Sequence, residues 1–193
     1  MALSLYHQKY QAQSDAKLQD KIDEKSAELL AIFKQVSFHP AYEPVKVAIL
    51  GCGDRRFVPA HRKLFAHYTE KTVDITTFDI TIEHLLGETQ FIQHDCTLPL
   101  PNQPYDITYA HVVLKFIPRE KQWDLIKTSY DALRSGGIAI HVLDTEEIGA
   151  TDERLSSGLY AVPFETLKER LKGEGITFVE VPLLYGIGLI LLK

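Results

Sequence analysis

Several apolar runs in the sequence end in residues that could contact a polar ligand. The first run ends at Gly51-Cys52-Gly53-Asp54, where missing side chains would let a ligand approach backbone N–H groups. The second ends at Asp79, whose carboxylate could accept hydrogen bonds from both hydroxyls of a ribose. The third ends at Asp95-Cys96, an acceptor beside a backbone N–H, which suits the edge of an adenine. Two further runs end at Ala110-His111 and Asp144-Thr145, and the set in this order indicates a nucleoside-sized ligand.

Each of these residues also has a purely structural interpretation. The glycines could serve only a tight turn, and Asp79 or Asp95 could simply cap the segment that follows. His111 could remove a proton from an accepting hydroxyl or amine, because the reference pKa of histidine is about 6.5. It could equally bond to backbone at a strand end. Cys52 and Cys96 have no base beside them in sequence, which favours small buried fillers over nucleophiles.

The hydrophobic pattern alternates between helical and strand-like spacing. Ser14-Asp15 offers capping oxygens to an amphipathic helix that ends before Pro40. Short apolar runs ending at glycine or aspartate are typical of strands buried on both faces. Their alternation with helices predicts a parallel sheet covered on both sides. The expected strands are 45–50, 73–78, 90–93, 105–113 and 138–143, with helices from Pro59, over 82–86, over 123–133 with Gly136-Gly137 as its cap, and from Pro163 to Gly173.

The end of the chain breaks this alternation. Two apolar runs, 176–181 and 186–192, are separated only by Pro182 to Tyr185, too few residues for a parallel crossover, so the pair must be antiparallel. The sequence therefore predicts an α/β fold with a seven-stranded, mainly parallel, doubly wound sheet, a C-terminal antiparallel hairpin and an N-terminal helix. We expect one domain over 1–193, with a helical extension at 1–40 and the core at 45–193.

Composition narrows the classes of function. A net charge of -5 argues against a protein that coats nucleic acid. No run reaches the ~18 apolar residues of a membrane span, and no signal peptide is visible, so we expect a cytoplasmic protein. The two cysteines have no metal-site spacing, and we expect no metal.

Five segments resemble the motifs of class I, Rossmann-like S-adenosylmethionine-dependent methyltransferases. They are, in family order, Ile49 to Gly53 (glycine motif), Phe78 to Leu85 (ribose segment), Asp95 to Leu100 (adenine segment), Tyr105 to Pro118 (fourth strand) and Leu133 to Gly137. The resemblance implies S-adenosylmethionine as cofactor and methyl transfer to a small-molecule acceptor. It also implies His111 as the candidate catalytic base, and cofactor contacts from Gly51, Cys52, Gly53, Asp54, Arg55, Asp79, Ile80, Asp95, Cys96 and Ala110.

Two positions depart from the family pattern. Ile49 stands where the family carries an acidic residue for the cofactor's amino group, and Arg55 replaces the third glycine. Asp54 could take over the amino contact, and Arg55 could pair with the cofactor's carboxylate. The alternatives are a non-catalytic binding or scaffold protein with this fold, and an NAD-dependent oxidoreductase, because Gly51 and Gly53 also fit a dinucleotide fingerprint.

Overall fold

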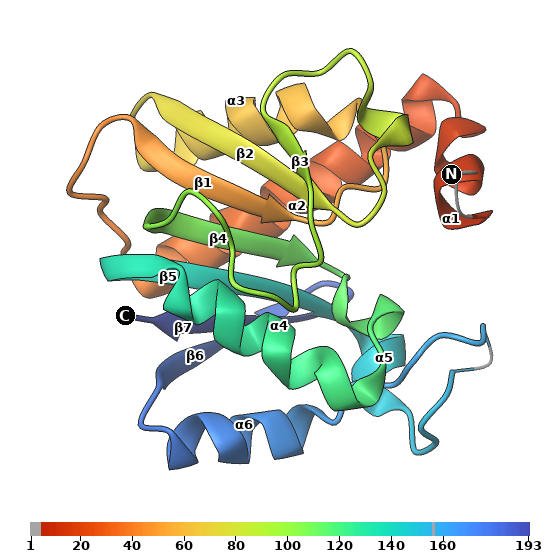
Figure 1. Ribbon diagram of the computed structural model, residues 1–193, viewed down its shortest axis with the longest axis vertical. Coiled ribbons are helices and arrows are strands. Elements are labelled where there is room, and N and C mark those ends of the chain that lie inside the picture. Colours follow the sequence, from red (N-terminus) through yellow and green to blue (C-terminus); the bar gives the residue numbers. More distant parts are fainter. Residues whose placement is uncertain (1–4, 156) are drawn as a thin grey trace.

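The computed structural model describes residues 5–155 and 157–193, which are built around one seven-stranded sheet (Figure 1). The strand order is β3-β2-β1-β4-β5-β7-β6. The chain runs outward from β1 to β3 and then returns to the other side of β1 as β4, so strand order reverses between β1 and β4. The strands are β1 (Val45–Leu50), β2 (Val73–Asp79), β3 (Phe91–Gln93), β4 (Tyr105–His111), β5 (Leu133–Asp144), β6 (Thr177–Leu183) and β7 (Gly186–Leu192).

Strand β7 is the one antiparallel member of this sheet. It pairs antiparallel with both β5 and β6, whereas the other neighbouring pairs are parallel. Only Leu184 and Tyr185 separate β6 from β7, a length that allows a hairpin and no crossover. The predicted fold class, with its C-terminal antiparallel hairpin, is confirmed.

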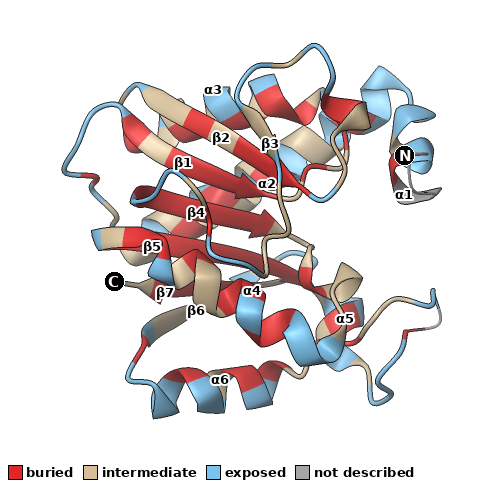
Figure 2. Ribbon diagram, in the orientation of Figure 1, coloured by how far each residue is buried: buried red, intermediate tan, exposed pale blue. Residues whose placement is uncertain are grey.

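Helices cover both faces of the sheet (Figures 1 and 2). One face carries α2 and α3 and the other carries α4 and α6, while the short α1 lies beyond the carboxyl ends of the strands. Ser14 caps α2 as predicted, its side chain accepting a hydrogen bond from the Lys17 amide. The helices are α1 (Leu5–Gln11), α2 (Asp15–Val36), α3 (Phe57–Thr69), α4 (Arg119–Asp131), α5 (Thr145–Gly149) and α6 (Phe164–Gly173), with 3-10 turns at Glu83–Leu85 and Leu114–Phe116.

Strand β1 is apolar except for Lys46, near its start, because both of its faces are covered. Ala48 and Leu50 pack into the apolar layer beneath α4 and α6, whereas Val47 and Ile49 pack into the layer beneath α2 and α3. A strand covered on both sides has no face left for polar residues. Within the part of the chain that the structure describes, no helix combines the length and apolar character needed to cross a membrane.

Several predicted elements have different bounds. The expected helix over 82–86 is only the 3-10 turn Glu83–Leu85, which is followed by Gly87 at φ +97°. The strand expected over 105–113 ends at His111. Gly136 and Gly137 do not cap α4 but lie inside β5, where a β-carbon on Gly137 would meet the Asp106 carbonyl oxygen at 2.9 Å. The helices α1 and α5 were not predicted, and residues 1–4 of the expected extension lie outside the described residues.

Candidate functional site

A cavity of about 300 Å³ opens at the carboxyl ends of β1, β2 and β4, beside the point where strand order reverses. Open α/β sheets bind their ligands at this position. We call it the central cavity; its lining is His7, Gly51, Cys52, Gly53, Asp79, Ile80, Thr81, His94, Asp95, Cys96, His111, Val112, Val113, Phe116 and Ile117. Eight of the eleven predicted site residues are thereby brought together.

The glycine loop after β1 forms the floor of the central cavity. Gly51 has φ +79°, a conformation that side chains disfavour, and its amide donates to the Phe78 carbonyl at 2.8 Å. A β-carbon on Gly51 would lie 3.0 Å from Val113 Cγ2. The loop therefore needs glycine at this position for both backbone and packing reasons.

Replacing Gly51 with alanine is expected to lower the free energy of unfolding by about 1–3 kcal/mol, because backbone strain and the Val113 contact add. Urea denaturation measures it. Gly136→Ala is the matched control, since Gly136 has φ +80° with no atom within 4 Å of its added β-carbon. The control isolates the backbone cost, and equal losses in both variants would show that the Val113 contact contributes nothing.

Asp79 joins the ends of β1 and β2. Its Oδ2 accepts from the Cys52 amide at 2.8 Å and its Oδ1 accepts from the Thr81 amide at 3.1 Å. The residue is only 6% exposed, yet it lines the cavity. Each carboxylate oxygen has a second acceptor position. Asp79 is thus held rigidly and can still accept hydrogen bonds from a ligand.

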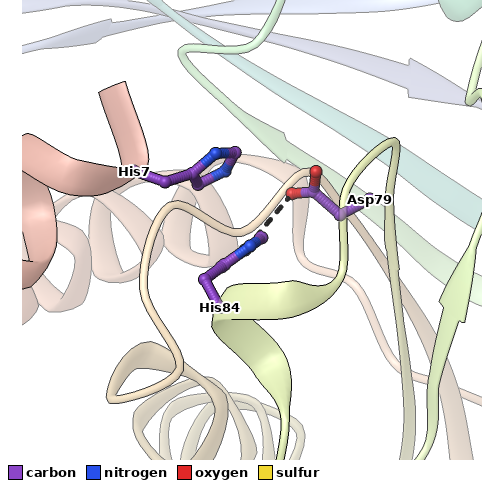
Figure 3. Close-up of side chains that lie close together, drawn as sticks. All are labelled: His7, Asp79 and His84. Carbon is purple, nitrogen blue, oxygen red and sulfur yellow. Dashed lines mark ion pairs between the residues drawn. The ribbon is translucent and has the colours of Figure 1, made fainter. Parts of the chain in front are cut away.

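Two histidines pack around Asp79 (Figure 3). The His7 ring from α1 stacks on His84 with ring centroids 4.0 Å apart, and His84 Nε2 lies 3.8 Å from Asp79 Oδ2. Nε2 of His84 also hydrogen-bonds the Cys52 carbonyl oxygen. The three residues offer potential metal-ligand atoms within 4.8 Å of one another. Because the two rings stack and His84 is bonded to backbone, we interpret the group as packing that orients Asp79.

The third strand end contributes Asp95 and Cys96. Oδ1 of Asp95 accepts from the amide and the hydroxyl of Thr97, at 3.0 and 2.7 Å, which fixes the carboxylate at the cavity wall. Ile80 directly follows β2, also lines the cavity, and is 64% exposed. Burial raises the pKa of both the Cys52 and the Cys96 thiol to about 12, so neither is a ready nucleophile.

Three predicted cofactor contacts do not line the central cavity. Ala110 is buried in the apolar layer beneath α4 and α6. Asp54 accepts hydrogen bonds from the Arg56 guanidinium at 2.9 and 2.8 Å; burial alone would raise the pKa of Asp54, but these bonds outweigh it and lower that pKa. Arg55 lines a separate hollow with Gln11 and Arg56. Contacts from these three residues to a ligand in the central cavity stay a prediction.

His111 occupies the junction of the neighbouring cavities. It lines the central cavity and also a second hollow of about 380 Å³, the outer cavity, whose other walls include Tyr10, Lys115 and Asp144. Its Nε2 lies 2.8 Å from Oε2 of Glu28 on α2, and its side chain is 23% exposed. Burial, followed by the charge of Lys25, lowers the pKa of His111 to about 4. The ring is therefore neutral at pH 7, with Nε2 donating to Glu28 and Nδ1 left as a base.

Sequence reasoning missed the site residues supplied by distant segments. His7 comes from α1, Glu28 from α2 and Thr81 from the turn after β2. Helical spacing predicted only that α2 would pack on the sheet, and no local pattern indicates which of its polar residues reaches a strand end. The Asp-Ile-Thr sequence of the ribose segment was the available signal for Thr81.

Comparisons with known proteins agree with the resemblance to methyltransferases. A family model described as a methyltransferase domain matches residues 49–141, which run from the end of β1 into β5. No curated protein matches the chain.

Three solved structures match this chain over most of their own length, at low sequence identity. A glycopeptide N-methyltransferase, MtfA, complexed with S-adenosyl-L-methionine has a TM-score of 0.63 at 11% identity, covering 87% of this chain and 93% of that one. An S-adenosylmethionine-dependent methyltransferase from Clostridium acetobutylicum has a TM-score of 0.62 at 12% identity, covering 91% and 94%. DhpI complexed with SAH has a TM-score of 0.57 at 16% identity, covering 97% and 94%. These structures share the fold.

Proposed function

We propose that this chain, whose residues 49–141 match a methyltransferase-domain model and whose fold is that of S-adenosylmethionine-dependent methyltransferases, transfers a methyl group from S-adenosylmethionine to a small acceptor beside His111. The observation that carries the proposal is the position of Asp79, fixed by two backbone amides at the wall of a cavity next to the glycine loop. Proteins with this fold crystallised with S-adenosylmethionine or its product support the choice of cofactor.

The residues present suit the adenosine part of this cofactor. The second acceptor positions of the Asp79 carboxylate suit two ribose hydroxyls, and Asp95 beside the Cys96 amide suits an adenine edge. Ile80 offers the base an exposed apolar side chain. The hydroxyl oxygen of Thr81 is buried at the cavity without a partner among the described residues, so it is available to a polar ligand.

The chemistry requires little covalent help from the protein. When bound, the cofactor supplies a methyl group already activated on its sulfonium. The chain must align the acceptor and, for a hydroxyl or an ammonium, remove one proton. Neutral His111, held by Glu28, would take that proton at Nδ1. The outer cavity borders the same histidine and would hold the acceptor, which suits a small molecule.

Calorimetry with S-adenosylmethionine, S-adenosylhomocysteine and NAD tests the proposal, followed by an assay for S-adenosylhomocysteine release with a panel of small hydroxyl and amine acceptors. We expect both sulfur nucleosides to bind and NAD not to bind. Tight binding of the nucleosides without turnover by any acceptor would favour the scaffold alternative. Binding of NAD alone would overturn the proposal in favour of an oxidoreductase.

Asp79→Ala is expected to weaken S-adenosylhomocysteine binding by about tenfold or more, because each lost charge-assisted hydrogen bond contributes roughly 1.5–3 kcal/mol. Calorimetry measures it, with circular dichroism to verify folding. Asp74→Ala is the matched control, since Asp74 lies near the opposite end of the same strand and accepts a hydrogen bond from the side-chain amide of Gln90. Unchanged affinity in Asp79→Ala would remove Asp79 from the ribose site.

A further inference from the structure

Lys25 is a buried lysine for which the described part of the chain supplies no ion-pair partner. It projects from α2, is 7% exposed, and its Nζ lies 5.3 Å from the ring centre of Phe57 and 5.8 Å from that of Tyr109. Among the described residues it makes no hydrogen bond and no ion pair. The nearby Glu28 carboxylate is bonded instead to His111. Burying an unpaired ammonium is costly, and such groups in proteins are generally paired or functional.

The Lys25 side chain lines a small hollow of about 50 Å³, the inner cavity. Two more polar side chains in its wall lack partners among the described residues: both ring nitrogens of His61, and the hydroxyl of Tyr109. His61 is uncharged, because burial and the charge of Lys25 hold its pKa well below the usual range. Lys21 and Glu24 also line the hollow, where they form an ion pair with each other at 3.8 Å. The hollow therefore adds to this neutralised pair the Lys25 ammonium and two neutral hydrogen-bonding groups, which suits an anion.

The inner cavity continues into the central cavity. Both are lined by the loop residues Gly51, Cys52 and Gly53 and by His111. A ligand whose nucleoside lies against Asp79 could thus extend past the glycine loop toward Lys25. The inner cavity has room for a group of a few atoms, because a cavity volume of about 10–15 Å³ is enough to hold one water molecule.

We propose that the Lys25 ammonium binds the carboxylate of the amino-acid part of the cofactor, with Tyr109 and His61 lining the same subsite. This inference rests on the proposed function and deepens it. A trapped water could satisfy His61 and Tyr109, but it would leave the charge of Lys25 uncompensated. Burial lowers the pKa of Lys25 to about 7, and a bound carboxylate would restore the charged form.

The two positions that depart from the family pattern support the assignment to α2. Ile49 is fully buried in the apolar layer beneath α2 and α3 and cannot reach a ligand. Arg55 lines a different hollow, with Asp54 and His84, and does not line the inner cavity. The carboxylate role considered for Arg55 therefore passes to Lys25, a residue about thirty positions earlier in the chain.

The test is to compare three ligands by calorimetry: S-adenosylhomocysteine, its decarboxylated analogue, and 5′-methylthioadenosine, which lacks the amino-acid part. We expect the parent to bind the first at least tenfold more tightly than the second. Lys25→Met should lose this preference, with affinity for S-adenosylhomocysteine reduced about tenfold or more and affinity for the other two retained. Lys17→Met, an exposed lysine on the same helix, should bind all three as the parent does.

Each outcome has a separate meaning. Equal losses for all three ligands in Lys25→Met would show a structural role and overturn the inference, as would an unchanged affinity for S-adenosylhomocysteine. A parent that binds none of the three refutes the proposed function and the inference with it. A parent that binds all three equally keeps the nucleoside site but refutes the carboxylate subsite. Thermal denaturation of Lys25→Met accompanies the titrations; a midpoint at or above that of the parent shows that the variant is folded.

Discussion

His111→Gln is expected to lower kcat by about 10²–10⁴-fold, the usual contribution of a positioned general base, while the affinity for S-adenosylhomocysteine changes by no more than about threefold. Glutamine can keep the hydrogen bond to Glu28 but has no basic nitrogen. The rate is followed as S-adenosylhomocysteine release, with the hydroxyl or amine acceptor that supports turnover of the parent. His39→Gln, an exposed histidine beyond α2, is the control and should match the parent.

The pH profile separates a base from a merely structural histidine. Because the pKa of His111 is lowered to about 4, the parent should keep its activity at neutral pH and lose it as the pH falls through about 4, where the ring becomes protonated. Glu28→Gln removes the carboxylate that orients the ring and should lower kcat less than His111→Gln does. A His111→Gln variant with parental kcat at neutral pH would rule out the base. Parallel losses of rate and affinity would indicate a positioning role.

The sequence predicted most of the sheet because local patterns encode it. Apolar runs such as Val45–Leu50 are buried on both faces, and the two residues between β6 and β7 leave only a hairpin. Where local signals competed, the prediction was wrong: Gly136 and Gly137 are typical of a helix cap, but here they let β5 pair with its neighbours across a register shift near Tyr105. Tertiary pairing outweighed the local signal.

The candidate site was predictable only where it lies at strand ends. Parallel strands bring their carboxyl ends together, so Gly51, Asp79 and His111 could be grouped from sequence. The residues that give the site its electrostatic character come from elsewhere. Glu28 meets His111 across 83 positions, and Lys25 reaches the glycine loop from the same helix. Helical periodicity indicates which face of a helix is buried. It does not indicate which residue a polar side chain on that face will contact, so these contacts could not be inferred.

Lys25 also has a large expected effect on stability, with the opposite sign to its effect on binding. Lys25→Met is expected to unfold less readily than the parent at pH 7, and the difference in free energy of unfolding should shrink by about 3 kcal/mol between pH 7 and 10. The native lysine loses its proton at about pH 7, whereas the unfolded chain keeps it to about pH 10.5. In this window the unfolded state binds more protons, so the parent gains stability as the pH rises. Methionine has no proton to lose.

Urea denaturation of both proteins across this range measures the difference. Comparing the two is essential because other ionisable side chains surround Lys25: Lys21, Glu24 and Glu28 share its helix, and Cys52, His61 and His111 face it from neighbouring elements. Burial raises the pKa of Cys52 to about 12, which makes the parent lose stability at high pH and opposes the lysine effect. Because burial, and not the charge of Lys25, is the largest cause of this shift, most of the contribution is common to both proteins. A pH-independent difference between Lys25→Met and the parent would mean that the ammonium is already neutralised in the folded chain, and a carboxylate would then gain little by binding it. A slope of the expected sign, together with weaker S-adenosylhomocysteine binding, would show that α2 keeps a destabilising charge at this position because the ligand needs it.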